Sequence, residues 1–231
     1  NYTVSITTSS GDSNYKLTIP NVQVTNNDNG DVAGIVVSVD PLTTLTTTEA
    51  SGASHTAIFT ITLHSQPTAN VVINLSSSNT DEGTVSPSNL TFGTGDWNSL
   101  KTVTITGVDD LVDDGDVDYN IITAAAVSAD GKYSGMDAND VKVRNIDNDN
   151  AGVTVTAISG HTTELGGTAT YTVKLNTKPT GDVIITSISD DATEGTISIG
   201  GSLTFTTTDW ATPKSLTVKG VDDYVADGNQ P

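Results

Sequence analysis

Short runs of alternating apolar and polar residues recur along the chain, separated by Gly, Asn, Asp and Ser. The alternation is clearest in Ile58–Leu63 and Val103–Thr106. A period of two residues predicts half-buried β-strands, and no segment sustains the period of an amphipathic helix. In the central part of the chain the pattern predicts these strands: Ile35–Val39, Thr56–Leu63, Asn70–Ser76, Asn89–Phe92, Leu100–Thr106, Tyr119–Val127 and Asp140–Asn145.

Turn signals lie between these runs, as in Asn29-Gly30, Asp114-Gly115 and Asp130-Gly131. Such dipeptides favour tight reversals of the chain. Short strands joined by turns of this kind are typical of an antiparallel sandwich with an Ig-like arrangement. We therefore expect an all-β protein.

The strand pattern itself is repeated, with offsets of 112 to 115 residues. Thr47–Glu49 returns as Thr162–Glu164, and Leu90–Phe92 returns as Leu203–Phe205. A unit of about 115 residues has the size of one sandwich domain. The sequence thus predicts tandem antiparallel Ig-like β-sandwich repeats of about 115 residues.

The N-terminal residues belong to the same pattern, because Val22–Asn29 resembles Val141–Asn148. We expect residues 1–31 to be the C-terminal strands of a preceding repeat and residues 32–149 to be a complete repeat. Residues 150–231 are expected to be the N-terminal part of the next repeat, lacking its last two strands. Two interpretations remain open: a slice of a longer array, or a filament subunit whose first strands complete the last domain of an identical neighbour by strand complementation.

An acidic loop follows one of the predicted strands. Gly107–Asp118 holds six Asp residues, no Lys or Arg lies between Lys101 and Lys132, and a similar sequence returns at Gly220–Gly228. Two like charges about 4 Å apart repel by roughly 4 kcal/mol at an effective dielectric constant of about 20. Ca²⁺, a hard cation that takes about six to eight oxygen ligands, would hold such a cluster together. A solvated acidic loop is the alternative.

Composition narrows the classes of partner. The chain of 231 residues has 28 acidic and 9 basic residues, giving a formal net charge of −19. Nucleic acids and anionic membranes require basic surfaces, so neither is an expected partner. No apolar run reaches the length of about 18 residues that a membrane-spanning helix needs, so we expect no direct membrane insertion. The chain has no Cys, which excludes disulfides and leaves bound metal ions as the expected stabilising links.

Four features together resemble a Calx-β-type module. They are the Glu that opens each unit, the Leu-Thr-Phe segment closed by Trp97 or Trp210, the Asp-Asp of the acidic loop with further acids behind it, and the terminal Asp147-Asn148-Asp149. The resemblance covers the whole chain, and similar repeats occur in tandem in bacterial surface and adhesion proteins. It implies that acidic residues converge at one end of each sandwich and bind several Ca²⁺ ions. The implied metal ligands are Asp28, Glu49, Glu82, Asp109, Asp110, Asp114, Asp116, Asp147, Asp149, Glu164, Glu194, Asp222, Asp223 and Asp227.

Other candidate chemistry is less well supported. His55, His64 and His161 do not recur at matching positions, which disfavours a histidine metal site. Trp97 and Trp210 recur in the same register, which favours a packing role over sugar stacking. A glycosidase pair of carboxylates is not expected, because the acids crowd at a domain end rather than in a cleft. The protein is therefore predicted not to be an enzyme.

The expected function is that of a calcium-rigidified extracellular structural or adhesive segment at a cell surface, which the resemblance implies to be bacterial. A metal ligand in the linker between repeats would make the geometry of the linker depend on the ion. The expected partners are neighbouring repeats or identical subunits arranged head-to-tail as a spacer, stalk or filament. The alternative is a glycan- or protein-binding β-sandwich module of a cell-surface adhesin, which would carry an exposed aromatic cluster in one repeat only.

Overall fold

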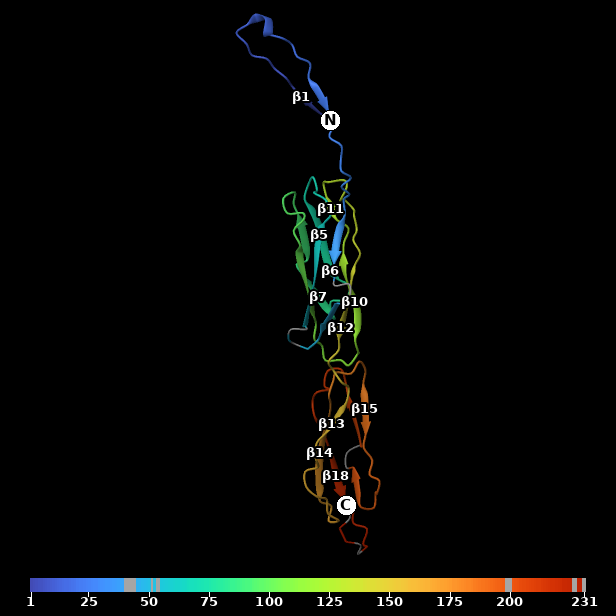
Figure 1. Ribbon diagram of the computed structural model, residues 1–231. Helices are drawn as coiled ribbons and strands as arrows, with labels where there is room; N and C mark the ends of the chain where they lie inside the picture. Colours follow the sequence, from blue (N-terminus) through green and yellow to red (C-terminus); the bar gives the residue numbers. More distant parts are fainter. Residues whose placement is uncertain (40–44, 51, 53–54, 198–200, 226–227, 230–231) are drawn as a thin grey trace.

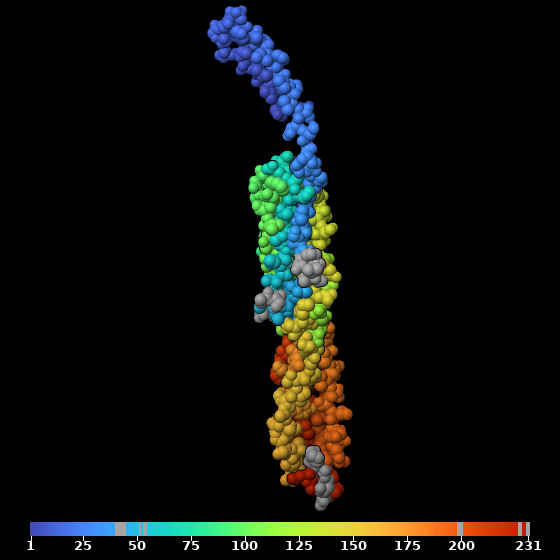
Figure 2. Space-filling model, viewed as in Figure 1, coloured from blue at the N-terminus to red at the C-terminus, as the bar shows by residue number. Residues whose placement is uncertain are grey.

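The structure is a computed structural model, and it describes residues 1–231 except 40–44, 51, 53–54, 198–200, 226–227 and 230–231. Regular secondary structure in this described part is almost entirely β-strand, which confirms the predicted all-β fold with antiparallel sandwich sheets. The sheets form three groups that follow one another along an elongated molecule (Figures 1 and 2). Among the described residues, no helix has the length and apolar character required to cross a membrane.

The first group is a two-stranded antiparallel hairpin. Strand β1 (Tyr2–Val4) pairs with β2 (Val22–Val24), and a short 3-10 turn, η1 (Ser13–Tyr15), lies between them. Within the described part of the chain no other strand pairs with this hairpin, so most of its side chains are exposed. An isolated hairpin of this kind is only marginally stable in water.

The second group is a sandwich of two facing sheets. One sheet has the order β3-β5-β9-β7, and the other has the order β11-β6-β10-β12-β4, with β8 also paired to β6. The strands of the first sheet are β3 (Ile35–Ser38), β5 (Thr56–Leu63), β9 (Lys101–Gly107) and β7 (Gly83–Ser86). The strands of the second are β11 (Val127–Ser128), β6 (Val71–Ser77), β10 (Val117–Thr123), β12 (Val141–Ile146), β4 (Leu45–Thr48) and β8 (Asn89–Phe92). These pairs are antiparallel except β12–β4, which is parallel.

Alternate residues of both sheets face inward and form the core of this sandwich. Along β5, Phe59, Ile61 and Leu63 are buried, and β10 contributes Tyr119 and Ile121 from the opposite sheet. Fully burying a side chain such as Leu, Ile or Phe contributes about 1.5–3 kcal/mol relative to leaving it exposed. The two sheets are therefore held together by the period-two pattern that the sequence shows.

The third group repeats one sheet of the sandwich and part of the other. Its strands β13 (Val153–Val155), β14 (Thr168–Leu175), β18 (Lys214–Gly220) and β16 (Gly195–Ile197) form a sheet in an order that corresponds to β3-β5-β9-β7. Strands β15 (Val183–Thr186) and β17 (Ser202–Phe205) pair as β6 and β8 do. The described residues after position 150 contain no strand that corresponds to β10, β11 or β12.

The strands expected in the central unit are present, with differences at their ends. Thr56–Leu63 and Asn89–Phe92 agree with the prediction. The predicted strand Tyr119–Val127 is wrong at its C-terminal end, because the chain leaves β10 after Thr123 and returns as the separate strand β11. Strands β4 and β7 were not predicted. The domain boundaries expected near residues 31 and 149 stay a prediction.

Candidate metal centre

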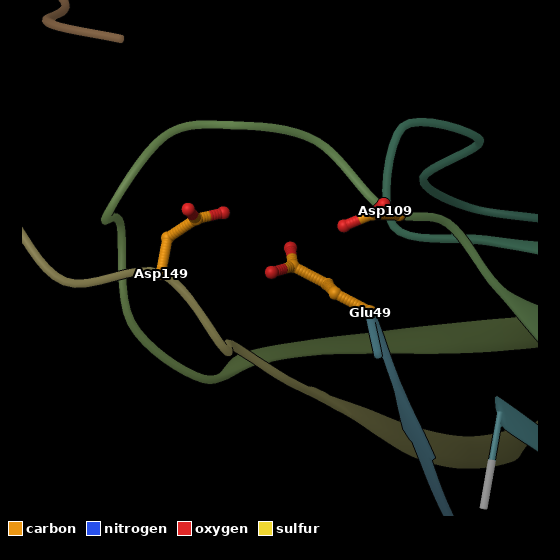
Figure 3. A group of neighbouring side chains, drawn as sticks. All are labelled: Glu49, Asp109 and Asp149. Carbon is orange, nitrogen blue, oxygen red and sulfur yellow. The ribbon is translucent and has the colours of Figure 1, made fainter. Parts of the chain in front are cut away.

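Acidic side chains of the central sandwich converge at the pole where β4, β9 and β12 end. Glu49 directly follows β4, Asp109 follows β9, and Asp149 lies in the segment after β12. One carboxylate oxygen from each of the three lies within 4.8 Å of the others, and Figure 3 shows the side chains turned toward a common space. In the part of the chain that the structure describes, this is the one group of three or more His, Cys, Asp or Glu residues with metal-ligand spacing.

The parallel pairing of β4 with β12 brings two of these ligands together although they are 100 positions apart in the sequence. The backbone N–H of Glu49 donates to the carbonyl of Ile146 at 3.1 Å, and the Asn148 N–H donates to Glu49 Oε2 at 3.3 Å. Gly107 ends β9 against the same strands. A Cβ at Gly107 would lie 2.7 Å from the carbonyl oxygen of Thr48, so a glycine is required for this close approach.

The acidic loop is joined to the segment after β12 by hydrogen bonds between carboxylates and backbone N–H groups. Asp147 Oδ2 accepts from the Gly115 N–H at 2.7 Å, and Asp116 Oδ1 accepts from the Asp147 N–H at 3.3 Å. Asp110 Oδ1 accepts from the N–H of Val112 at 2.7 Å. Gly115 has a φ of +77°, a left-handed conformation that glycine adopts without strain. These contacts place the ligands expected from the acidic loop beside the three carboxylates.

Burial and mutual repulsion disfavour the charged forms of several of these acids. Burial, together with the nearby carboxylates of Asp147 and Asp110, raises the pKa of Glu49 to about 7. Burial and the charge of Asp147 also raise the pKa of Asp149, and burial and neighbouring acids raise the pKa of Glu82 and of Asp114. Ionisation of these acids in the folded protein therefore costs free energy unless a cation compensates their charge.

The pKa of Asp147 is lowered, whereas the pKa values of the neighbouring acids are raised. Burial alone would raise its pKa, but hydrogen bonds from the backbone N–H groups of Asp149 and Gly115 lower it. One carboxylate in the cluster is thus held in its charged form by the backbone, which suits a permanent ligand to a cation.

The described residues provide no basic partner for this pole. Their ion pairs join Lys101 to Asp96, Lys142 and Arg144 to Asp118, and Lys214 to Asp209. Asp118, although part of the acidic loop, is therefore neutralised by the protein itself. Asp149 Oδ2 is buried without a hydrogen-bond partner, which is costly for a carboxylate oxygen. An orphaned buried oxygen among other carboxylates fits a divalent cation.

A buried amide below the pole was not identified from the sequence. Asn145 is 1% exposed, and its Nδ2 donates to Glu82 Oε2 and to the carbonyl of Val108, at 3.3 and 3.1 Å. Its Oδ1 accepts from the hydroxyl of Thr47 at 2.9 Å. Asn145 thus connects β4, β12 and the start of the acidic loop. The recurrence of this residue as Asn26 in the N-terminal hairpin was the available signal.

Replacing Asn145 by Ala is expected to destabilise the central sandwich by about 2 kcal/mol, because buried groups that lose their partner cost about 1–3 kcal/mol. The variant should also bind Ca²⁺ more weakly, because Glu82 and Val108 lose their common support. Chemical denaturation in EDTA measures the first effect, and calorimetric titration measures the second. Asn139→Ala, at an exposed position in the loop before β12, is the matched control. Unchanged stability of Asn145→Ala would contradict this role.

The third group of strands places its expected ligands at the corresponding pole but less close together. The Val221 N–H donates to the carbonyl of Glu194 at 3.0 Å, as the Val108 N–H does to Glu82 at 2.9 Å. Asp223 accepts from the Val225 N–H, as Asp110 does from Val112.

Glu164 and Asp222 are exposed and do not join a group with metal-ligand spacing among the described residues. Asp28 lies in the segment after the hairpin, where its carboxylate accepts from the Gly30 N–H at 3.1 Å. Asp227 lies outside the described residues. Among the described residues, the one acidic group with metal-ligand spacing is thus in the central sandwich.

The acidic loop also contacts the third group of strands. Asp113 Oδ2 accepts from the Ala151 N–H at 2.7 Å, and the carbonyl of Leu111 accepts from the Lys178 N–H at 2.6 Å. Beside these contacts lies a cavity of about 580 Å³ that is lined from both sides, by Val112 and Asp113 and by the turn from Leu175 to Val183. The candidate metal centre and the junction between the two units therefore share one loop.

Comparison with known proteins gives similarity of fold only. Neither a protein-family model nor a curated protein sequence matches the chain. Among solved structures, the calcium binding domain CBD12 of CALX1.1 is 18% identical with a TM-score of 0.33, covering 78% of this chain and 73% of that one. Domains 5–6 of the S-layer protein SbsC are 20% identical with a TM-score of 0.27, covering 82% and 84%.

A third similar structure is the CsuC–CsuE chaperone–tip adhesion subunit complex from the Csu pili of Acinetobacter baumannii. It is 10% identical with a TM-score of 0.35 and covers 84% of this chain and 90% of that chain. All three TM-scores are below 0.5, so the interpretation of function rests on the geometry of the site. Membership of the Calx-β family stays a prediction.

Proposed function

We propose that this protein is a calcium-rigidified structural or adhesive segment of an extracellular, cell-surface assembly. The observation that carries the proposal is the acidic pole formed by Glu49, Asp109 and Asp149, with an orphaned buried oxygen and no basic partner in the described residues. The same loop that surrounds this pole bonds to the following unit. One bound ion would therefore act both on the acidic pole and on the junction with the following unit.

Ca²⁺ suits this donor set better than other common cations. The ligands are carboxylate oxygens, which hard cations prefer, and no described histidine belongs to the group. Ca²⁺ binds about six to eight oxygen ligands in a flexible arrangement. Mg²⁺ requires a nearly ideal octahedral arrangement and usually keeps several bound waters. Ligands drawn from three strand ends and one loop match the flexible requirement.

The positions of the ligands explain why a bound ion would make the linker between the two units rigid. Asp149 lies two residues before Ala151, the residue whose N–H bonds to Asp113. An ion held by Asp109 and Asp149 would tie the end of β9 to the start of the linker. Without the ion, repulsion between these carboxylates would push the linker and the acidic loop apart. The ion therefore controls the orientation of the two units.

We propose no catalytic role, since the acids act together on one cation and lie at the end of a sandwich. A glycan- or protein-binding module remains the second candidate. It would be favoured by a contiguous aromatic surface in one repeat only. The exposed tyrosines of the described residues, at 2, 15 and 224, lie on the hairpin and at the C-terminal pole rather than on one sandwich face.

Pulsed electron-paramagnetic-resonance distances between two spin labels test the proposal directly. The chain has no native Cys, so Thr102→Cys on β9 and Lys174→Cys on β14 place one exposed label on each unit. With Ca²⁺ the distance distribution should be narrow, and in EDTA it should broaden several-fold. The double variant Asp109→Asn with Asp149→Asn should stay broad in both conditions, whereas Asp137→Asn, exposed and outside the pole, should behave as the parent. Equal widths with and without Ca²⁺ would refute calcium-dependent rigidity.

A further inference from the structure

The inward-facing row of strand β12 changes from apolar to polar near the end of the strand. The buried residues of β12 are Val141, Val143 and Asn145, so an amide occupies a position that the alternation of the strand assigns to the core. Asn145 is 1% exposed. A polar group buried to this extent is stable only when hydrogen bonds replace its contacts with water. The partners of Asn145 therefore show what the residue holds in place.

Asn145 is the middle of a chain of hydrogen bonds. Thr47 lies directly opposite it in the parallel pairing of β4 with β12, and the Thr47 hydroxyl donates to Asn145 Oδ1 at 2.9 Å. The hydroxyl oxygen of Tyr119, a residue of β10 that is 3% exposed, lies 3.3 Å from Thr47 Oγ1. Beyond the amide, Asn145 Nδ2 donates to Glu82 Oε2 at 3.3 Å and to the carbonyl of Val108 at 3.1 Å. The chain thus runs from a core tyrosine to the acidic pole.

The chain of hydrogen bonds has one direction. An amide oxygen only accepts and an amide nitrogen only donates. Asn145 Nδ2 faces two acceptors, so the reversed amide would place its oxygen against the oxygens of Glu82 and Val108. The Thr47 hydroxyl uses its proton on Asn145 Oδ1, and the Tyr119 hydroxyl therefore donates to Thr47 Oγ1. The two hydroxyls together select the orientation of the amide.

The first sheet leaves room for this chain at two glycines. Gly83 and Gly107 lie directly opposite each other in the pairing of β7 with β9. A Cβ at Gly83 would overlap the hydroxyl of Tyr119, and a Cβ at Gly107 would lie 2.7 Å from Asn145 Oδ1. A larger residue at either position would displace a member of the chain. The two sheets therefore pack directly against the polar chain at this pole.

The same residue types recur at the corresponding positions elsewhere in the sequence. They are Tyr2 for Tyr119, Asn26 for Asn145, Thr162 for Thr47, Glu194 for Glu82, Gly195 for Gly83 and Gly220 for Gly107. The alternation of apolar and polar residues does not require polar side chains at buried positions. Their recurrence therefore favours a role that the repeats have in common.

We infer that Tyr119 and Thr47 act through Asn145 as positioning residues for the cation site. They hold the amide in the orientation that engages the carboxylate of Glu82 and the carbonyl of Val108, the residue directly before Asp109. The bond to Glu82 engages one carboxylate oxygen, and a cation can take the other. Residues that hold metal ligands in this way typically contribute a factor of about 10–100 to metal affinity. The effect on affinity rests on the proposed function, whereas the orientation of the amide does not.

Calcium titration of variants tests the effect on the cation site. Thr47→Val keeps the shape of the side chain and removes the hydroxyl, so the affinity for Ca²⁺ should fall by roughly tenfold or more. Thr47→Ser keeps the hydroxyl and should bind Ca²⁺ as the parent does. Tyr119→Phe removes only the first donor of the chain and should weaken binding several-fold. Isothermal titration calorimetry of the whole chain measures these affinities. Unchanged affinity in Thr47→Val would overturn the inference.

Tyr133 is the matched control, because it is also a buried tyrosine but lies at the opposite end of the sandwich. It is 1% exposed and donates its hydroxyl to the carbonyl of Ser65 at 2.5 Å. Ser65 follows the end of β5, whereas the acidic loop follows the end of β9, which pairs with the start of β5. Tyr133→Phe should lower stability in chemical denaturation, as Tyr119→Phe does, but should keep the Ca²⁺ affinity of the parent. Equal losses of affinity in the two variants would overturn the inference, because general loosening of the core would explain them.

Hydrogen exchange of the Asn145 side chain, followed by NMR in EDTA, tests the orientation of the amide without a metal ion. Both acceptors of Nδ2 are buried in the parent, so its protons should exchange slowly with water. Thr47→Val should accelerate this exchange by roughly five- to tenfold, the factor that one hydrogen bond contributes. Thr47→Ser and Tyr133→Phe should retain slow exchange. Equally slow exchange in Thr47→Val would overturn the role of the Thr47 hydroxyl.

The outcomes separate this inference from the proposed function. If the parent, Thr47→Val and Tyr119→Phe bind Ca²⁺ with the same affinity, the metal proposal stands and the positioning role is wrong. If the parent binds no Ca²⁺, the metal proposal is wrong and the effect on affinity is overturned with it. Exchange that is slow in that parent and faster in Thr47→Val would still support the orientation of the amide by the two hydroxyls.

Discussion

Chelation of calcium is expected to lower the melting temperature of the central sandwich by roughly 10 °C. A ligand that binds only the folded state contributes about 2.7 kcal/mol at a concentration 100 times its dissociation constant. For a unit of this size, each kcal/mol shifts the melting temperature by a few degrees, about 2–8 °C across small domains. Ca²⁺ should restore the loss more effectively than Mg²⁺, because the donors come from separate segments that do not form a strict octahedron.

The response should depend on the carboxylates that converge at the pole. Asp109→Asn with Asp149→Asn is expected to abolish the calcium-induced rise in melting temperature, while leaving a metal-free protein that is at least as stable as the parent, because two repelling charges are removed. Asp137→Asn, on an exposed loop away from the pole, should keep the full response. Scanning calorimetry with EDTA, Ca²⁺ and Mg²⁺ measures these effects. A parent whose melting temperature is the same in EDTA and in excess Ca²⁺ would contradict the assignment of a metal centre.

The dependence of stability on pH is expected to reverse sign when calcium is bound. Burial raises the pKa of Glu49 from 4.5 to about 7 in the folded protein. Between these values the folded protein binds more protons than the unfolded chain, so the stability of the metal-free protein falls as pH rises from about 5 to 7.5. The raised pKa values of Asp149, Glu82 and Asp114 act in the same direction.

Calcium imposes the opposite trend, because it requires deprotonated ligands. Its affinity should therefore increase over the same range of pH, and the stability of the calcium-bound protein should rise. Lowered pKa values, such as that of Asp209 at about 2, affect stability only at more acidic pH. Melting curves at pH 5, 6 and 7.5 with and without Ca²⁺ measure the two slopes. Glu49→Gln should flatten the slope of the metal-free protein, and a slope that stays the same in this variant would exclude Glu49 as its origin.

The alternation of apolar residues was sufficient to predict the fold. It located β5 and β8 to the residue, because their inward positions carry large apolar side chains such as Phe59 and Phe92. It failed at β4, whose sequence Leu-Thr-Thr-Thr shows no alternation of apolar residues. That strand is defined by its parallel pairing with β12, a contact between residues about 98 positions apart that no local pattern encodes.

The site was also predictable only where a local sequence pattern indicates it. Crowding of Asp residues after a strand indicated cation chemistry, and Asp109 was expected on that ground. The placement of Glu49 beside Asp149 depends on the β4–β12 pairing, so the residues alone did not determine it; the family resemblance implied it. Asn145 was missed because an amide within a strand has no distinctive local signal, and its role arises only from burial between Thr47 and Glu82.

The chain enters the central sandwich at one end through β3 and leaves it at the other end after β12 (Figure 1). Tension applied along the molecule would therefore pull these two strands in opposite directions, parallel to their own axes. The ladder hydrogen bonds, which lie across the strands, would be loaded in shear and would have to break together rather than unzip one after another. Such a topology is expected to resist tension applied along the long axis of the molecule.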